Sequence, residues 1–327
     1  MLALDRFAET YLAQWERLAT VRSARRSVVP AGVGADGLFP EMLQSFCRDP
    51  AVVALGAEAR RFILVQGCLF FCHEIALVET DVVSGLATAL ANRPQRVELS
   101  APVRQVALTI AVDEAYHAFA AREFVEQVEQ ATGLRTIAPP DRCGLELALR
   151  AGHAETPREA LDMFDVLTLC IAENTITADI LGLKQETAPD NPFHVALEEH
   201  LVDERRHQGY FQLVLAHYWA GLDDDERRMV TPGLAAFVGR FITDTEPFRA
   251  HDATVLAAAG LPAAEARRIV DASYDGWPAE LETGIARNIR RVLDRAGVLG
   301  HAPTAEALQR CGLRLVAPAT EGQALAG

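Results

Sequence analysis

The sequence has few cations, and this scarcity excludes several classes of protein. Lys and Arg number 31 against 45 Asp and Glu, which gives a formal net charge of −14 and a pI near 5.1. Such a surface repels nucleic acid and anionic membranes, so we expect neither as a partner. Strand-like alternation of apolar and polar residues is also missing over any useful length. We therefore predict an all-α fold.

The cysteines offer no C-x-x-C pair for a metal or a redox disulfide. Cys68 and Cys72 lie in an apolar run and are expected to be buried small residues. This usage fits a reducing compartment. The first residues form a charged amphipathic helix rather than a secretory signal, and we predict a cytoplasmic location.

A long uninterrupted hydrophobic run is absent as well. The most apolar stretch, residues 62–91, carries His73, Glu74, Glu79 and Asp81. These charges argue against a membrane span and favour a core helix with a function. Half of the residues are hydrophobic and the mean hydropathy is +0.08, which is enough apolar material for a substantial core.

The helical pattern predicts a single helical domain over residues 1–327. Its parts are a core bundle at about 51–220, additional helices at about 221–311 and a frayed tail at 312–327. In the bundle, Ser100 with Pro102 and Asp190 with Pro192 mark two helix starts. The predicted helices span 2–24, 51 or 58–92, 100–131, 144–151, 156–184, 190–220, 231–247, 251–259, 262–275, 278–296 and 303–311.

The segment 199–207 contains the most informative motif. In a helix, His200, Glu204 and His207 share one face, because residues three and four apart lie one above another. Glu and His at this spacing can hold a metal ion between them. A polar surface helix is the alternative reading of this segment.

A second Glu-x-x-His pair, Glu114 and His117, lies in an apolar helix. A buried Glu is costly unless it is paired or bound to a metal. Asp113 is a rival ligand, although it lies four residues from His117 rather than three. Glu114 and Glu204 each lie fourteen residues after the predicted helix start, about 20 Å along the axis, so the two motifs can face each other.

Two further helices contribute one acidic residue each. Glu173 lies in an apolar stretch with no Lys or Arg within a helical turn, and Asn174 beside it is expected to hydrogen-bond a ligand. In the helix before residue 92, either Glu74 or Glu79 can serve. Glu79 lies thirteen residues before the helix end, close to the eleven of Glu173, whereas Glu74 lies eighteen before it. We favour Glu79 and expect Glu74 to bond a ligand or His73.

Two helices with Glu-x-x-His and two with a lone Glu form the pattern of a carboxylate-bridged di-iron or di-manganese bundle. Iron is the metal that activates dioxygen. The third histidine, His200, lies one helical turn before Glu204. The equivalent position one turn before Glu114 is Ile110, which cannot bind a metal, so the predicted site is asymmetric. The predicted ligands are Glu79, Glu114, His117, Glu173, His200, Glu204 and His207.

This ligand set resembles the p-aminobenzoate N-oxygenase family over roughly residues 50–220. The resemblance implies a ferritin-like four-helix bundle with additional N- and C-terminal helices, in a homodimer. It implies two iron ions per chain, dioxygen as co-substrate and an external electron donor such as a reductase or ferredoxin. Family members, in natural-product biosynthesis, oxidise the amine of a small, usually aromatic or amino-acid-derived, molecule through hydroxylamine and nitroso toward nitro, with a peroxo-diferric intermediate. The resemblance does not imply a particular substrate.

Other functions remain open at this point. The same ligands serve C–H hydroxylation, desaturation and oxidative cleavage. A ferroxidase or metal-storage protein is a second alternative, although this chain is about twice the size of such a bundle. A non-catalytic helical interaction protein is a third.

The surroundings of the site are predicted less directly. Tyr116 is expected to pack in the core, and Tyr210 is a candidate for the pocket wall. Arg205 and Arg206 are expected to pair with surface carboxylates, with an acidic substrate as the alternative. Further candidates for the pocket wall are Phe237, Phe241 and Phe248.

Overall fold

The computed structural model describes residues 2–23, 28–30, 38–275 and 284–315. Over these residues the chain is helical with short connections and contains no strand. The predicted all-α fold is therefore confirmed.

The first half of the bundle is one long helix and its antiparallel partner. The long helix consists of α4 (Ala57–Leu77), a π-helical turn η3 (Val78–Val83) and α5 (Ser84–Asn92). Its partner is α6 (Ala101–Thr132), which ends at Gly133 with a φ of 72°. Glycine adopts this left-handed conformation without steric cost, so it ends the helix where the sequence predicted.

The second half pairs α8 (Leu161–Gln185) with α9 (Pro192–Gly221). The predicted N-cap of α9, Asp190, is wrong by one residue. Asn191 caps the helix instead, because its side chain accepts a hydrogen bond from the Phe193 amide at 2.9 Å. Ser100 does precede α6, but its hydroxyl bonds Asp5 at 2.5 Å rather than the helix backbone.

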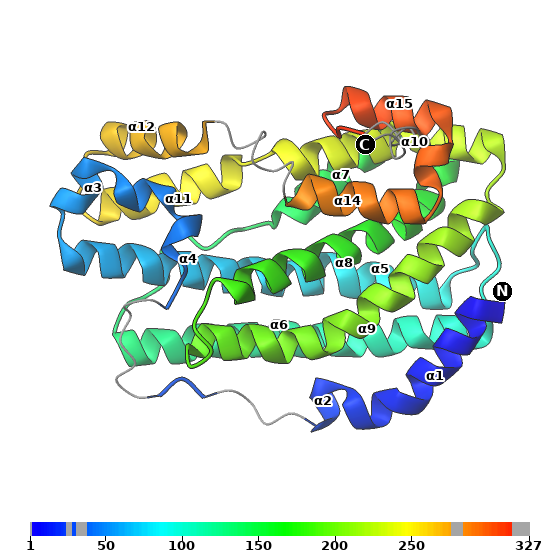
Figure 1. Ribbon diagram of the computed structural model, residues 1–327, viewed down its shortest axis with the longest axis horizontal. Coiled ribbons are helices and arrows are strands. Elements are labelled where there is room, and N and C mark those ends of the chain that lie inside the picture. Colours follow the sequence, from blue (N-terminus) through cyan, green and yellow to red (C-terminus); the bar gives the residue numbers. More distant parts are fainter. Residues whose placement is uncertain (1, 24–27, 31–37, 276–283, 316–327) are drawn as a thin grey trace, which may run out of the picture.

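Two N-terminal helices lie against α6 and α9, along the lower edge of Figure 1. They are α1 (Leu2–Leu18) and α2 (Thr20–Ser23), where the sequence predicted one helix over 2–24. Short helical segments lie between the longer ones. These are η1 (Glu41–Leu43), η2 (Ser45–Arg48), α3 (Pro50–Ala54), α7 (Gly144–Glu155) and η4 (Arg158–Ala160).

The C-terminal third adds helices on one side of the bundle, along the upper edge of Figure 1. They are α10 (Asp224–Thr243), α11 (Glu246–Ala258), α12 (Ala263–Tyr274), α14 (Ile285–Arg295), η5 (Val298–Gly300) and α15 (Ala302–Arg310). The predicted start of α10 at 231 is wrong, because Asp223 and Glu226 form a capping box that starts the helix earlier. The predicted start at 278 and the tail after 315 lie outside the described residues.

Two hydrophobic clusters fill the bundle, and polar side chains lie between them. On α6, Ile110 belongs to one cluster and Phe124 to the other. On α9, Tyr210 belongs to the first cluster and Leu201 to the second. The Glu-x-x-His motifs occupy the stretch between these residues on both helices.

One helical stretch in the described residues, Ala57–Asn92, is long and apolar enough to cross a membrane by composition, with a mean hydropathy of 1.7. In the fold, 61% of its most apolar window is buried inside the protein. Core helices pass the same test, so this feature is weak evidence for a membrane.

Candidate metal centre

All seven predicted ligands meet in the middle of the four-helix bundle, and all are buried. They form two groups, in each of which the ligand atoms lie within 4.8 Å of one another. One group is Glu79, His117, His200 and Glu204. The other is Glu114, Glu173, Glu204 and His207. Glu204 belongs to both groups, as a carboxylate bridging two metal ions does.

The π-helical turn contains the carboxylate of the first helix. Glu79 is the second residue of η3 and is 3% exposed. A π turn holds one residue more than an α-helical turn and is often found at functional sites. Glu74 lies away from the centre, where it accepts a hydrogen bond from the Gly144 amide at 3.3 Å. It is bonded neither to a predicted ligand nor to His73, so that expectation is wrong.

The first group has an imidazole nitrogen aimed between two carboxylates. His200 Nε2 lies 3.5 Å from Glu79 Oε1 and 3.4 Å from Glu204 Oε1. This buried nitrogen makes no hydrogen bond, although such atoms are normally paired. The ring stacks on His117 with the centroids 4.1 Å apart. An orphaned nitrogen between two carboxylate oxygens fits a metal ligand.

The second group is arranged around Glu114. Its Oε2 lies 2.7 Å from His117 Nδ1, and its Oε1 lies 2.8 Å from His207 Nδ1. Glu204 Oε1 lies 3.2 Å from the same nitrogen of His207. Glu114 therefore lies between the two motif histidines, next to the shared Glu204.

Each motif histidine is held by an aspartate from the opposite motif. His117 Nε2 donates to Asp203 Oδ2 at 3.2 Å, and His207 Nε2 donates to Asp113 Oδ2 at 3.2 Å. A carboxylate partner fixes the tautomer, so Nδ1 of both rings faces the centre. Asp113 was considered in the sequence only as a rival ligand, and Asp203 was missed. The repeated pattern Asp-Glu-x-x-His, at 113–117 and 203–207, is the signal that would have found both.

The N-terminal helices reach both aspartates. The Trp15 indole donates to the two oxygens of Asp113 at 3.0 Å each, and the Thr20 amide donates to Asp203 at 3.1 Å. Arg206 also donates to Asp203, which is 0% exposed. The predicted surface role of Arg206 is therefore wrong. It neutralises a buried carboxylate beside the centre.

The buried carboxylates of the centre repel one another, so positive charge between them is stabilising. Burial, reinforced by Glu114 and the other carboxylates, raises the pKa of Glu79 well above its usual range. Burial opposes the charging of His117 as well, yet the charge of Glu114 raises its pKa to about 10. Burial and the neighbouring His117 lower the pKa of His200, so this ring is neutral and its Nε2 can donate an electron pair to a metal ion. Protons thus compensate the buried carboxylates in the absence of cations, and two divalent ions match four carboxylates in charge.

The donor set favours particular metals. Carboxylate oxygens with imidazole nitrogens and no thiolate suit iron or manganese better than softer ions. The two groups differ, since the first holds two imidazoles and the second holds one. The site is therefore asymmetric, as the sequence predicted. The additional imidazole, His200, belongs to the group that contains His117 and Glu79.

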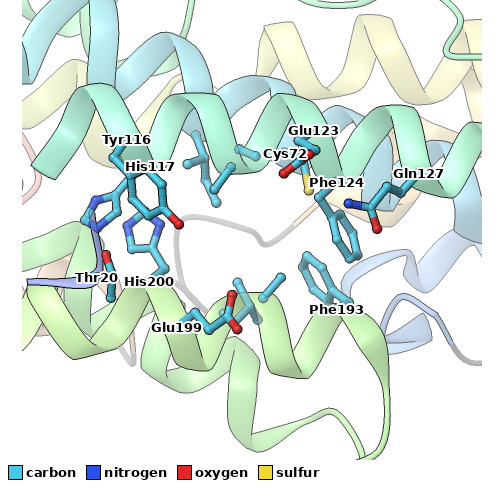
Figure 2. A pocket seen from close by; sticks show the side chains of 15 residues that line it. Thr20, Cys72, Tyr116, His117, Glu123, Phe124, Gln127, Phe193, Glu199 and His200 are labelled. Atoms are coloured by element: carbon cyan, nitrogen blue, oxygen red, sulfur yellow. The ribbon is translucent and has the colours of Figure 1, made fainter. Parts of the chain in front are cut away.

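A pocket leads from the surface to the first group (Figure 2). Its volume is about 720 Å³ including the open mouth, and α4, α6 and α9 supply most of its walls. His117 and His200 lie at one end, while Phe124 and Phe193 lie at the other. Tyr116 lines this pocket, so its predicted core role is wrong.

The other aromatic candidates for the wall lie elsewhere. Tyr210 is fully buried and donates to the Val103 carbonyl at 2.8 Å. Phe237 packs against Phe164 and Phe241, and Phe248 packs against Phe70. The described walls of the pocket include no residue from the C-terminal third. These predictions failed because they relied on aromatic composition and not on position in the bundle.

Comparison with known families agrees with the geometry. The family model described as P-aminobenzoate N-oxygenase AurF matches residues 36–297. The match includes all seven predicted ligands and both aspartates. No curated protein matches the chain.

Proposed function

Because the chain belongs to the p-aminobenzoate N-oxygenase family of di-iron oxygenases, we propose that it oxidises the amine of a small aromatic or amino-acid-derived metabolite. The product lies on the series hydroxylamine, nitroso, nitro, and dioxygen supplies the oxygen. The observation that carries this proposal is the pair of buried ligand groups that share Glu204. The described lining of the pocket includes ligands of only one group, His117 and His200. This supports binding of the substrate on that side of the centre.

Each side chain has a role in this proposal. The carboxylates of Glu79, Glu114, Glu173 and Glu204 and the three imidazoles would hold two iron ions, which supply the electrons for activating dioxygen when bound. Asp113 and Asp203 keep the Nε2 protons of His207 and His117, so that both rings present Nδ1 to the centre. The apolar clusters on either side of the ligand groups limit the access of water to the centre from the two ends of the bundle.

The pocket positions the amine at the more imidazole-rich group. A substrate that enters between α6 and α9 meets His117 and His200 before any other predicted ligand. A neutral His200 can accept a hydrogen bond or bind metal without repelling an amine. We further propose that an external electron donor restores the reduced centre between turnovers, and that the chain works as a homodimer in the cytoplasm.

The test begins with metal binding. The purified protein is loaded with ferrous iron without air, and we expect about two ions per chain. Oxygen is then added with a panel of arylamines, and ¹⁸O₂ labels the products for mass spectrometry. Label on the substrate nitrogen is expected. Product labelled only on carbon would replace N-oxygenation with another oxidation, and consumption of oxygen without organic product would indicate a ferroxidase.

Two matched variants of the long first helix make the test specific. Glu79→Gln is expected to lower the iron content and abolish the product, because it removes a predicted ligand from the first group. Glu74→Gln alters a half-buried carboxylate five residues away that lies outside both groups, and it should leave about two ions bound. Equal loss of iron in both variants would count against the assignment of Glu79.

A further inference from the structure

An aromatic side chain connects one of the two supporting aspartates to the surface. The Trp15 indole donates to both carboxylate oxygens of Asp113 at 3.0 Å, and His207 Nε2 donates to the same carboxylate at 3.2 Å. Asp113 and His207 are 0% exposed, whereas Trp15 is half-buried. It belongs to α1, which lies against α6 on the outside of the bundle (Figure 1). The three side chains therefore form a continuous hydrogen-bonded path from the surface to a predicted metal ligand.

The neighbouring side chains offer no equivalent path. Asp203, the other supporting aspartate, accepts hydrogen bonds from Thr20 and Arg206, and neither of these has an aromatic ring. Tyr11 lies one helical turn before Trp15, but it is 3% exposed, and its hydroxyl makes no hydrogen bond within the described part of the chain. Of these side chains, Trp15 alone combines a partly exposed aromatic ring with a hydrogen bond toward the centre.

The surroundings of the indole favour the inward passage of electrons. The Arg22 guanidinium lies over the Trp15 ring, 5.5 Å from its centroid, and pairs with Glu16 at 2.6 Å. A cation in this position attracts the electrons of the ring, so it opposes their loss from the indole and lowers the energy of an electron that enters there. Electrons also tunnel more efficiently through bonded and hydrogen-bonded atoms than across gaps. The path through Trp15 therefore suits transfer from the surface to the centre.

The path and the pocket reach different sides of the centre. His207, at the inner end of the path, belongs to the second ligand group. The pocket is lined by His117 and His200, which belong to the first group. Electrons that enter along the path therefore do not require an empty pocket.

We propose that electrons from the external donor enter the centre through Trp15 and pass along the Asp113 carboxylate and the His207 ring. This inference rests on the proposed function, which requires a donor to restore the reduced centre between turnovers. The donor is a one-electron carrier protein, which is too large for a pocket of about 720 Å³. Two carrier molecules are each oxidised by one electron, and each electron reduces one ferric ion to ferrous. No bond forms or breaks in the three side chains.

Reduction of the ferric protein tests the path without any substrate. The iron-loaded, oxidised protein is mixed without air with reduced methyl viologen, a one-electron donor, and the absorbance of the ferric centre is followed. In Trp15→Phe, which keeps a ring but loses the N–H donor, we expect the reduction rate to fall about tenfold or more. Tyr11→Phe alters the preceding turn of the same helix and should keep the parental rate. Ala120→Phe, which narrows the pocket, should keep it as well.

A second variant separates electron transfer from the positioning of Asp113. Trp15→Gln keeps a side-chain N–H donor but lacks the ring, and its reduction should be as slow as that of Trp15→Phe. Both variants should keep the parental iron content and the parental yield of product when hydrogen peroxide replaces dioxygen and donor, because peroxide supplies the oxygen and both electrons. A parental reduction rate in Trp15→Gln, loss of iron from both variants, or loss of the peroxide-driven reaction would show a structural role for Trp15 and overturn the proposal.

The outcomes separate this proposal from the proposed function. Reduction that depends on Trp15, without product from any arylamine, would support the electron path and remove the N-oxygenase activity. Labelled product together with parental reduction in Trp15→Phe would leave N-oxygenation intact and overturn the path. Slow reduction in Ala120→Phe but not in Trp15→Phe would place the entry of electrons in the pocket, which also overturns the proposal.

Discussion

Asp113 and Asp203 are buried aspartates, and each accepts a hydrogen bond from a histidine in the other half of the bundle. Each precedes the Glu of its own motif and bonds the His of the opposite motif. A change in one helix is therefore transmitted to a ligand on the other. This reciprocal arrangement makes the orientation of both rings depend on the packing of α6 against α9.

We predict that Asp113→Asn and Asp203→Asn each weaken metal binding about 10- to 100-fold, the usual effect of losing a carboxylate behind a ligand histidine. The effects should be similar in size because the two contacts have the same length. Competition with a chelator for Mn²⁺ measures them. Asp162→Asn, at an exposed position of α8, serves as the control. Affinities unchanged in both aspartate variants would contradict the assigned role.

Asp252 is a buried carboxyl group on α11 that belongs to neither ligand group. It is 6% exposed and accepts a hydrogen bond from the Tyr274 hydroxyl at 2.8 Å. Burial raises its pKa to about 7. The folded protein therefore holds this proton more tightly than the unfolded chain. The associated stability is fully present below the unfolded-state pKa and is lost as the pH rises through about 7.

Asp252→Asn should remove this dependence while keeping an acceptor for Tyr274. At pH 8 we expect the variant to be more stable than the parent, by roughly 4 kcal/mol, because the pKa of Asp252 is raised from 3.8 to about 7. The difference should shrink toward pH 4. Denaturant unfolding at several pH values measures it, and the exposed Asp294→Asn should follow the parent at every pH. A constant difference across the range would show that Asp252 does not titrate as described.

At the scale of elements, the long helices and the depth of the motifs could be predicted because turn residues and apolar spacing are local signals. Counting from the helix ends favoured Glu79 over Glu74, and the structure places only Glu79 in the centre. The π turn that contains Glu79 was not predicted, because its sequence, VETDVV, has no local signature that separates it from an α-helix. Pocket walls depend on which helix faces pack together, and residue type alone does not determine that.

The π turn itself can be tested by removing one residue. Thr80 lies within it and is exposed, with its hydroxyl bonded to the Ala76 carbonyl at 2.8 Å. Deleting Thr80 should convert the turn to α-helix and keep the register of α5, but it should turn Glu79 away from the centre. We expect the helical signal in circular dichroism to persist while the iron content falls from about two ions to one or fewer. Thr80→Ala should keep both ions, and full iron content in the deletion would show that the turn is not required.

At the scale of the whole molecule, the centre joins segments that are distant in sequence. The ligands come from the four long helices, and α1 and α2 reach the supporting aspartates through Trp15 and Thr20. Without cations, this junction buries mutually repelling carboxylates between two hydrophobic clusters. Metal binding should therefore stabilise the entire bundle and not only its centre.

We predict that metal removal lowers the thermal midpoint of the whole protein and that Mn²⁺ or Fe²⁺ restores it. A single site filled at a hundred times its dissociation constant contributes about 2.7 kcal/mol, which is several degrees for a chain of this size. Calorimetric scans with and without a chelator measure the change. Glu204→Ala lacks the residue shared by both ligand groups, so its midpoint should not respond to metal. An equal response in this variant would mean that the ions act at the acidic surface, because a centre that depends on Glu204 cannot stabilise the bundle once that carboxylate is removed.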